Sequence, residues 1–150
     1  MASTRPVRGF TLLELLVVLV VLGIVLATIT IAGGGGPERA LRFEAERVAQ
    51  LLSLAREEAQ VTGAPIRFEA DGERYRFLVR ADRGWRPAAD PDLRERRWDA
   101  PTRVRVERPD GRADVEFGRD TVDVPFRLRL GREGATVAIV ANGLGRFAVE

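Results

Sequence analysis

The longest pattern along the chain is an apolar run from Phe10 to Ala32, whose 23 residues include one ionisable side chain, that of Glu14. As an α-helix at about 1.5 Å per residue, this run is about 34 Å long and exceeds the roughly 30 Å hydrocarbon core of a bilayer. The run therefore predicts a transmembrane helix over residues 10–32.

A second helical pattern covers residues 38–63 and is amphipathic. Apolar side chains recur there at intervals of three and four residues, which places them on one face of a helix. They are Leu41, Ala45, Val48, Leu51, Leu52, Ala55 and Ala59. We expect this face to pack on the protein's own sheet, and Gly63 stands where the helix would end. Between the two helices, the glycine-rich residues 33–37 predict a hinge that ends or bends the apolar helix, because glycine and proline disfavour helix.

After Gly63 the pattern changes to short segments in which apolar and polar residues alternate, as is typical of half-buried β-strands. The strands are predicted at 66–70, 75–79, 104–106, 115–117, 126–130, 137–141 and 146–149. The first two, the next two and the last two are separated by turn residues and predict three hairpins. Residues 131–134 would end the remaining strand, and residues 82–97 predict a loop. We expect an α+β fold with an antiparallel β domain over 64–150.

Composition excludes several classes of chemistry. The chain has no His and no Cys, and all 24 of its basic residues are Arg, so the usual general base, thiolate metal ligands and lysine Schiff bases are missing. The formal net charge of +2 comes from Arg5 and Arg8, and the chain from Phe10 onward is electrically balanced. We therefore expect no enzyme activity, no cofactor and no metal, and the basic pI does not indicate nucleic-acid binding.

A group of four aspartates, Asp90, Asp92, Asp120 and Asp123, raises the question of calcium. Their spacing does not match a known loop of oxygen ligands. We interpret them as solvated or Arg-paired turn residues.

The segment before the apolar run predicts how the chain is oriented. Arg5 and Arg8 precede the run, so the positive-inside rule predicts that residues 1–9 are cytoplasmic and that the domain after the run lies in the periplasm. Glu14 is unusual in such a run, because an acidic side chain at the centre of a membrane helix costs roughly 2.5–3.5 kcal/mol. An uncleaved single-pass anchor and a signal peptide cut after Ala32 remain alternatives, although the apolar region of a signal peptide is usually about 7–15 residues long and uncharged.

The leader and the start of the run, RGFTLLE, resemble the class III signal of type IV pilins and type II secretion pseudopilins. The resemblance implies cleavage between Gly9 and Phe10 by a prepilin peptidase and N-methylation of Phe10. In a filament, the new Phe10 amine would meet the Glu14 carboxylate of a neighbouring subunit, and the low dielectric there would strengthen this ion pair. The same resemblance implies a long N-terminal helix, membrane-spanning in its first half, packed on two antiparallel sheets.

Residues 51–77 and the closing VAIVANGLGRF are similar to the H-type minor pseudopilins of type II secretion and to the related FimT-like minor pilins. The shared positions include Ala55, Arg56, Glu58, Ala59 and Gly63. This resemblance implies a subunit at or near the tip of a periplasmic pseudopilus, which supports protein export across the outer membrane. The implied partners are the prepilin peptidase, the major and other minor pseudopilins, and the inner-membrane assembly platform.

Two other functions remain open on the sequence. A FimT-like minor pilin that captures DNA should have arginines unopposed by acids, and the best candidates are Arg127, Arg129 and Arg132. The DNA-binding relatives carry Gly-Arg-x-Arg near the carboxy terminus, whereas residues 145–148 of this chain read Gly-Arg-Phe-Ala. A membrane-tethered enzyme is the other possibility, and it would have to rely on Thr or carboxylate groups.

Overall fold

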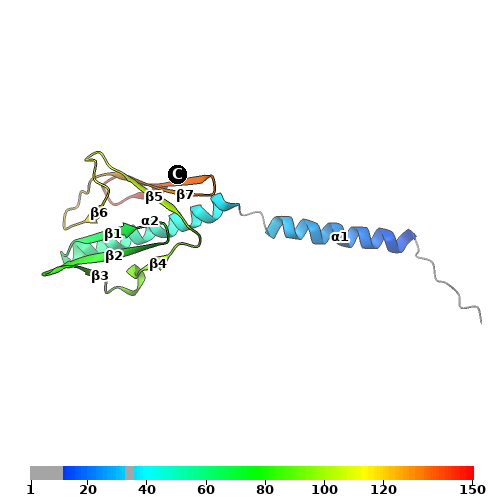
Figure 1. The fold of residues 1–150 in the computed structure, drawn as a ribbon, viewed down its shortest axis with the longest axis horizontal. Coiled ribbons are helices and arrows are strands. Elements are labelled where there is room, and N and C mark those ends of the chain that lie inside the picture. The colour runs from blue at the N-terminus through cyan, green and yellow to red at the C-terminus, as the bar shows by residue number, and fades with distance from the viewer. Residues whose placement is uncertain (1–11, 33–35) are drawn as a thin grey trace, which may run out of the picture. The chain divides into compact units, whose positions relative to one another are not determined.

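The computed structural model describes residues 12–32 and 36–150, with side chains for residues 12–23 and 36–150. The chain divides into two compact units, Met1–Gly36 and Pro37–Glu150. The first unit contains helix α1 (Leu12–Ala32). The second contains helix α2 (Pro37–Thr62) and two β-sheets (Figure 1).

Helix α2 begins and ends at residues that suit those positions. Pro37 is its first residue, where the missing amide proton costs no hydrogen bond. Gly63 follows its last residue with φ of 69°, and its amide donates to the Ala59 carbonyl at 2.9 Å. This left-handed conformation suits glycine and satisfies a carbonyl at the helix end. The seven residues of the predicted apolar face are all buried.

The first sheet is antiparallel, in the order β3-β2-β1-β6, and β4 also pairs with β2. Its strands are β1 (Ile66–Ala70), β2 (Arg74–Ala81), β3 (Gly84–Pro87), β4 (Arg96–Arg97) and β6 (Val115–Phe117). The predicted first hairpin is confirmed, since β1 pairs with β2 from Ile66 opposite Val79 to Ala70 opposite Tyr75.

The second sheet is also antiparallel, in the order β5-β7-β8-β9. Its strands are β5 (Arg103–Glu107), β7 (Phe126–Arg132), β8 (Ala135–Ala141) and β9 (Phe147–Val149). The predicted last hairpin is confirmed as β8 and β9. Helix α2 contacts strands of both sheets and runs along them (Figure 1). The predicted class, one helix packed on an antiparallel domain of two sheets, is confirmed.

The second predicted hairpin is wrong. Both of its strands exist, as β5 and β6, but β5 pairs with β7 and β6 pairs with β1, so they belong to different sheets. The predicted turn does form, since the Gly111 amide donates to the Arg108 carbonyl at 3.1 Å. Arg108 also donates to the Asp114 carbonyl at 2.6 Å, which fixes a wide connection between the sheets rather than a tight hairpin.

Two other boundaries differ from the prediction. Residues 82–97 are not only a loop, because β3 and β4 lie there beside β2 and a short 3-10 helix, Pro91–Leu93, separates them. Strand β2 is eight residues long, and one edge of it pairs with β4 at its beginning and with β3 at its end. Strand β7 is two residues longer than the predicted 126–130 and ends at Arg132, within the segment 131–134 that is predicted to end it. The turn to β8 uses Glu133 and Gly134, both with positive φ.

Candidate functional site

Helix α1 is apolar on every side. The ten large apolar side chains from Leu12 to Leu22 are exposed, with values between 46% at Val18 and 84% at Leu12. Glu14 lies in the first turn among them. A helix that is apolar all round is normally covered by protein or lipid. Within the first unit, the described residues leave these side chains uncovered, so α1 is suited to contact lipid or other subunits.

Only one of the residues predicted for processing and assembly lies in the described part of the chain. Gly9 and Phe10 lie outside the described residues, so the predicted cleavage site is not observed, while Glu14 is observed in α1. A search of the described residues finds no helix whose length and apolar character suffice to cross a membrane. The transmembrane segment predicted over 10–32 extends beyond the described residues and stays a prediction.

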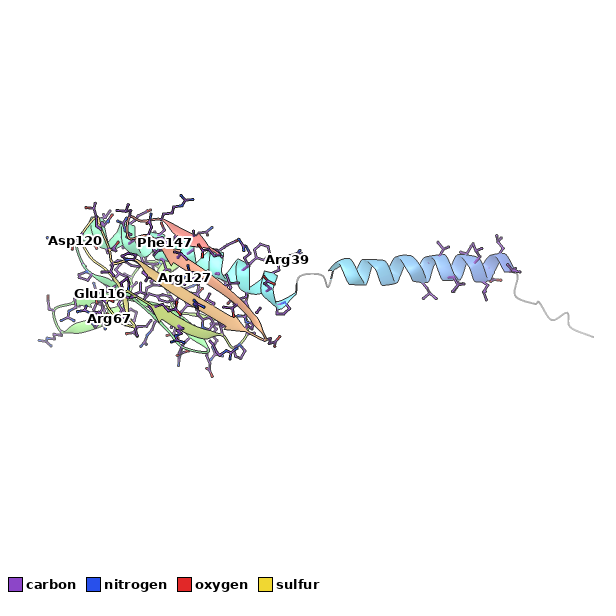
Figure 2. The ribbon with its side chains drawn as sticks, turned by 90° about the horizontal axis from the view of Figure 1, so that it is seen from above. Arg39, Arg67, Glu116, Asp120, Arg127 and Phe147 are labelled. Carbon is purple, nitrogen blue, oxygen red and sulfur yellow. The ribbon has the colours of Figure 1, made fainter. Side chains whose placement is uncertain are left out.

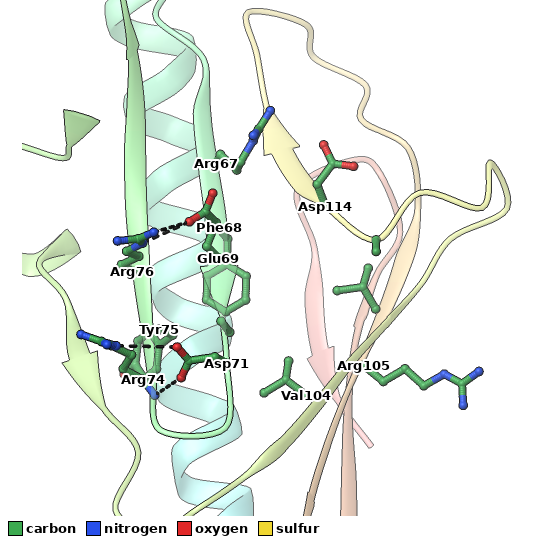
Figure 3. Close-up of a pocket in the computed structure, with 13 residues that line it drawn as sticks. Arg67, Phe68, Glu69, Asp71, Arg74, Tyr75, Arg76, Val104, Arg105 and Asp114 are labelled. Atoms are coloured by element: carbon green, nitrogen blue, oxygen red, sulfur yellow. Dashed lines mark hydrogen bonds and ion pairs between the residues drawn. The ribbon is translucent and has the colours of Figure 1, made fainter. Parts of the chain in front are cut away.

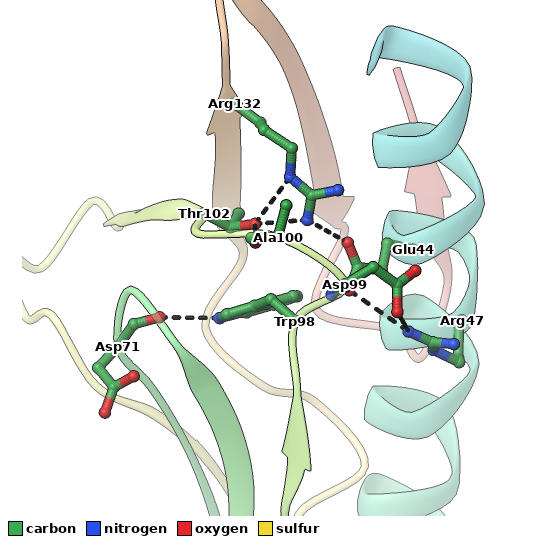
Figure 4. A network of polar contacts seen from close by, with 8 residues as sticks. All are labelled: Glu44, Arg47, Asp71, Trp98, Asp99, Ala100, Thr102 and Arg132. Atoms are coloured by element: carbon green, nitrogen blue, oxygen red, sulfur yellow. Dashed lines mark hydrogen bonds and ion pairs between the residues drawn. The ribbon is translucent and has the colours of Figure 1, made fainter. Parts of the chain in front are cut away.

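The second unit contains a buried polar network centred on Glu44 of α2, which is 2% exposed (Figure 4). Its carboxylate accepts a hydrogen bond from the Arg132 guanidinium, which is 6% exposed, and another from the Asp99 amide at 2.9 Å. Arg132 Nη2 also donates to Thr102 Oγ1 at 2.6 Å. Arg47 approaches Glu44 from the solvent side at 3.4 Å. The network joins α2, β7 and the segment before β5.

Two aromatic residues lie beside this network. The Trp98 indole donates to the Asp71 carbonyl at 2.8 Å (Figure 4). The ring centroid of Trp98 lies 4.5 Å from that of Tyr75. Burial raises the pKa of the Tyr75 phenol, although the nearby Arg47 guanidinium acts in the opposite direction. The side chains of Glu44, Thr102 and Arg132 are buried and bonded to one another, so the network stabilises the fold of this unit.

This network is not among the predicted sites, although two patterns in the sequence point to it. Glu44 lies three residues after Leu41 and four before Val48, which puts it on the buried face of α2. Arg132 continues the alternation of Phe126, Leu128 and Leu130, whose side chains are all buried. The pairing of the two residues depends on the fold, because they are 88 positions apart.

A second polar cluster involves Arg56, a residue of the segment that carries the family resemblance. Arg56 Nε donates to Asp123 Oδ2 at 2.6 Å, and Arg56 also donates to the Thr121 carbonyl. A Cβ at Gly145 would lie 2.6 Å from Arg56 Nη1, so the β8–β9 turn closes tightly on the guanidinium. Arg56 therefore ties α2 to the loop before β7 and to the last turn.

Two of the four aspartates considered for calcium have structural roles. Asp123 is paired with Arg56, as the Arg-paired interpretation predicts, and Asp90 caps the 3-10 helix by accepting from the Asp92 amide at 2.7 Å. Within residues 12–32 and 36–150, no group of three or more acidic side chains is arranged to hold a metal ion.

The three arginines proposed for DNA are each paired with a carboxylate. Arg127 lies 2.9 Å from Glu150, Arg129 lies 3.0 Å from Glu107, and Arg132 is buried against Glu44. Arg127 lies on strand β7 of the second sheet (Figure 2). Since binding to phosphates requires arginines that are exposed and unopposed, this group does not form the expected DNA site.

An apolar helix with an acidic first turn, joined to a unit of one helix and two antiparallel sheets, defines a subunit of the pilin-like class. A family model described as "Prokaryotic N-terminal methylation motif" matches residues 4–30, a range that includes Gly9, Phe10 and Glu14. A second, described as "Type II transport protein GspH", matches residues 44–145, more than half of the chain. The chain therefore belongs to the GspH family and is a GspH-type pseudopilin.

Individual relatives agree with this assignment. The type II secretion system protein H of Pseudomonas aeruginosa is 29% identical over 167 aligned positions, which cover 97% of each chain. Two solved structures of the minor pseudopilin EpsH from the type 2 secretion system of Vibrio cholerae are 19% identical. Their TM-scores are 0.60 and 0.61, and they cover 73% and 75% of this chain and 94% of their own. At this identity the likeness shows the fold, which is pilin-like as expected.

Proposed function

We propose that this chain is a minor pseudopilin at or near the tip of a periplasmic pseudopilus and supports protein export across the outer membrane. The observation that carries the proposal is that an apolar helix exposed on every side is attached to a GspH-type domain. The role is structural, without catalysis. A FimT-like role in a type IV pilus is not favoured, because the family match is to a type II transport protein and the candidate DNA arginines are paired.

The proposed location follows from the leader and the apolar run. Residues 10–32 insert in the inner membrane as a single span, with residues 1–9 in the cytoplasm and the domain from residue 38 onward in the periplasm. A prepilin peptidase cleaves between Gly9 and Phe10 and methylates the Phe10 amine. The subunit then leaves the membrane and joins the major and other minor pseudopilins at the assembly platform.

The exposed side chains of α1 explain how such a transfer is energetically possible. A helix that leaves lipid loses its packing with acyl chains, and contacts with neighbouring apolar helices can replace that packing. In the filament the Phe10 amine of one subunit pairs with Glu14 of the next. This pair sets the register between subunits, because an ion pair in a low-dielectric core is favourable only when geometry is good.

The test is the intact mass and amino-terminal sequence of the full chain, extracted from membranes with and without a co-expressed prepilin peptidase. The expected product begins with N-methylated Phe10 and is abolished by Gly9→Ala. An intact leader despite active peptidase would mean a simple anchor, and a chain beginning at Gly33 would mean an exported domain.

Assembly is tested separately with Glu14→Gln, which keeps the side-chain shape and removes the charge, and with Glu14→Ala. Both variants should be processed normally but recovered poorly in sheared pseudopilus fractions, and secretion should fall with them. Glu57→Gln, on α2, is the matched control. Normal incorporation of both Glu14 variants would show that the ion pair is unnecessary.

A further inference from the structure

A groove of about 980 Å³ lies between the two sheets of the second unit and is not used by the assembly mechanism (Figure 3). Its walls are β1 on one side and β5 on the other. Its lining is apolar at the centre, where Phe68, Ala70, Val104 and Val106 contribute, and charged at the rim. This volume lies at the upper end of the range of about 300–1,000 Å³ that is typical of ligand pockets.

The groove is bounded by two strand edges. In the β1–β2 ladder, the Asp71 amide donates to Arg74 and the Arg80 amide donates to Pro65, so odd-numbered residues of β1 bond to β2. The backbone groups of residues 66, 68 and 70 therefore face the other side. Strand β6 pairs with β1 only from Ile66 to Phe68. The amide and carbonyl of Ala70 thus face the groove, where the described chain places no strand.

Strand β5 is the other edge. It pairs with β7 on one side, and the second sheet, as far as the structure describes it, has no strand on the other. The two ends of the groove are fixed. The Thr102 amide donates to the Gly72 carbonyl at 3.0 Å at one end, and Arg108 holds the Asp114 carbonyl at 2.6 Å at the other. A hydrogen bond between the two sides thus closes the groove at each end.

Strand β5 also presents uncompensated positive charge. Its side chains alternate, so that Val104 is directed toward the groove and Arg105 away from it (Figure 3). Arg105 is directly opposite Arg129 of β7, and Glu107 pairs with Arg129. Among the described residues, Arg103 and Arg105 have no carboxylate within ion-pair distance. Like charges directly opposite each other on a sheet are destabilising, so an acid beside Arg105 would be favourable.

Strand β6 shows how a strand occupies this kind of edge. It lies on β1 with Val115 and Phe117 buried, and Glu116 turned outward to Arg67 at 3.0 Å. Arg67 and Glu116 lie next to each other at the surface (Figure 2). An apolar–acidic–apolar alternation is therefore the pattern that already fits beside β1 in this molecule.

We propose that this groove binds an extended segment of a partner protein, in which acidic and apolar residues alternate, as a strand added to β5. The apolar side chains enter the groove beside Val104 and Val106, and the acidic ones lie beside Arg103 and Arg105. Main-chain hydrogen bonds to the free edge supply affinity, and the two rows of side chains supply selectivity. The inference concerns a surface separate from α1 and does not depend on how Glu14 acts.

The test uses the full chain purified in detergent and three fluorescein-labelled heptapeptides in a polarisation titration. The first alternates Glu and Val, beginning and ending with Glu. The second has Lys in place of Glu, and the third has Pro in place of the central Val. The Glu peptide should bind, and the other two should bind at least about tenfold more weakly, because one has the wrong charge and the other lacks a ladder amide. No binding of the Glu peptide, or equal binding of the Pro peptide, overturns the proposal.

Two variants separate this site from general charge effects. Arg105→Glu should weaken binding of the Glu peptide by about tenfold or more and strengthen binding of the Lys peptide. Arg94 is also exposed and lies away from the groove, so Arg94→Glu should change the binding of neither peptide. Arg94→Glu should leave the unfolding midpoint unchanged, and Arg105→Glu should not lower it, because it replaces a like-charge pair with Arg129 by an opposite-charge pair. Equal effects of the two variants refute the site. If Arg105→Glu instead dissociates a dimer of the chain, β5 pairs with a second copy and the proposed partner is wrong.

Discussion

The buried pair of Glu44 and Arg132 allows a quantitative test of what holds the second unit together. The perturbation is Glu44→Met, which leaves the Arg132 guanidinium 6% exposed and without its carboxylate. Removing one partner of a buried ion pair typically costs about 3–5 kcal/mol, because an uncompensated charge remains in a low-dielectric interior. Since domains of this size are stable by about 5–15 kcal/mol, the variant should lose a large part of its stability.

The double variant Glu44→Met/Arg132→Met distinguishes this explanation from simple loss of contacts. With both charges removed, the remaining cost is the Asp99 amide that loses its acceptor, about 1–3 kcal/mol. The double variant should therefore be more stable than the Glu44→Met single variant. The interaction energy from the double-mutant cycle should be about 2 kcal/mol or more.

A matched control is available on the same strand. Arg127 and Glu150 form a pair of the same chemical type at 2.9 Å, but their side chains are 39% and 58% exposed. Exposed pairs contribute about 0.2–1 kcal/mol. Arg127→Met should therefore lower the free energy of unfolding by no more than about 1 kcal/mol.

The assay is urea unfolding of the full chain in detergent, followed by the fluorescence of Trp98. This indole is 6% exposed and lies against the network, and a Trp85→Phe background removes the other tryptophan signal. The reasoning is refuted if the double variant is as unstable as the sum of the two single variants. It is equally refuted if Glu44→Met and Arg127→Met cost the same.

Two further predictions concern turns. Gly145→Ala should destabilise the protein by about 1–3 kcal/mol more than Gly134→Ala, as measured by urea unfolding. The two glycines have φ of 91° and 85°, but only at Gly145 would the added Cβ meet Arg56, and the difference should shrink in an Arg56→Ala background. Asp71→Ala should lower the melting temperature at neutral pH. Backbone hydrogen bonds from Glu73 and Arg74 hold the pKa of Asp71 below its usual value, so its contribution is present above that value and is lost as the pH falls through the folded pKa. This account would be contradicted if the difference in melting temperature between Asp71→Ala and the wild type were the same at about pH 2 and pH 6.

Local sequence patterns are sufficient to predict the elements whose form depends on residues close in sequence. The spacing of Leu41, Val48 and Leu52 predicts α2, because burial of one helix face imposes a period of 3.6 residues. Asp71 and Gly72 predict the first hairpin for a similar reason, since a short turn leaves the flanking strands no other neighbour. In both cases the physical cause lies within a few residues of the effect.

The second hairpin shows where such reasoning fails. Residues 108–111 form the turn that the sequence predicts, but β5 and β6 then pair with strands from elsewhere in the chain. The pairing is decided by the burial of Val115 and Phe117 beside β1, which a local pattern does not contain. The same limit applies to Glu44 and Arg132, each of which is visible as a charged residue at a buried position while its partner is not.

The two units differ in how far their apolar side chains are covered by the rest of the same unit, and this difference bears directly on function. Leu41 and Leu52 of α2 are 0% exposed because the sheets of the same chain cover them, whereas Leu12 and Leu13 of α1 are 84% and 73% exposed. The described part of the first unit does not cover the latter, and apolar surface left in water is unfavourable by about 25 cal/mol per Å². The second unit can therefore fold on contacts made within the chain, and its surface, including the edge of β5, is available to determine which partners it meets. We therefore expect substitutions in α1 to impair incorporation into a filament, and substitutions on the surface of the second unit to change which partners it binds.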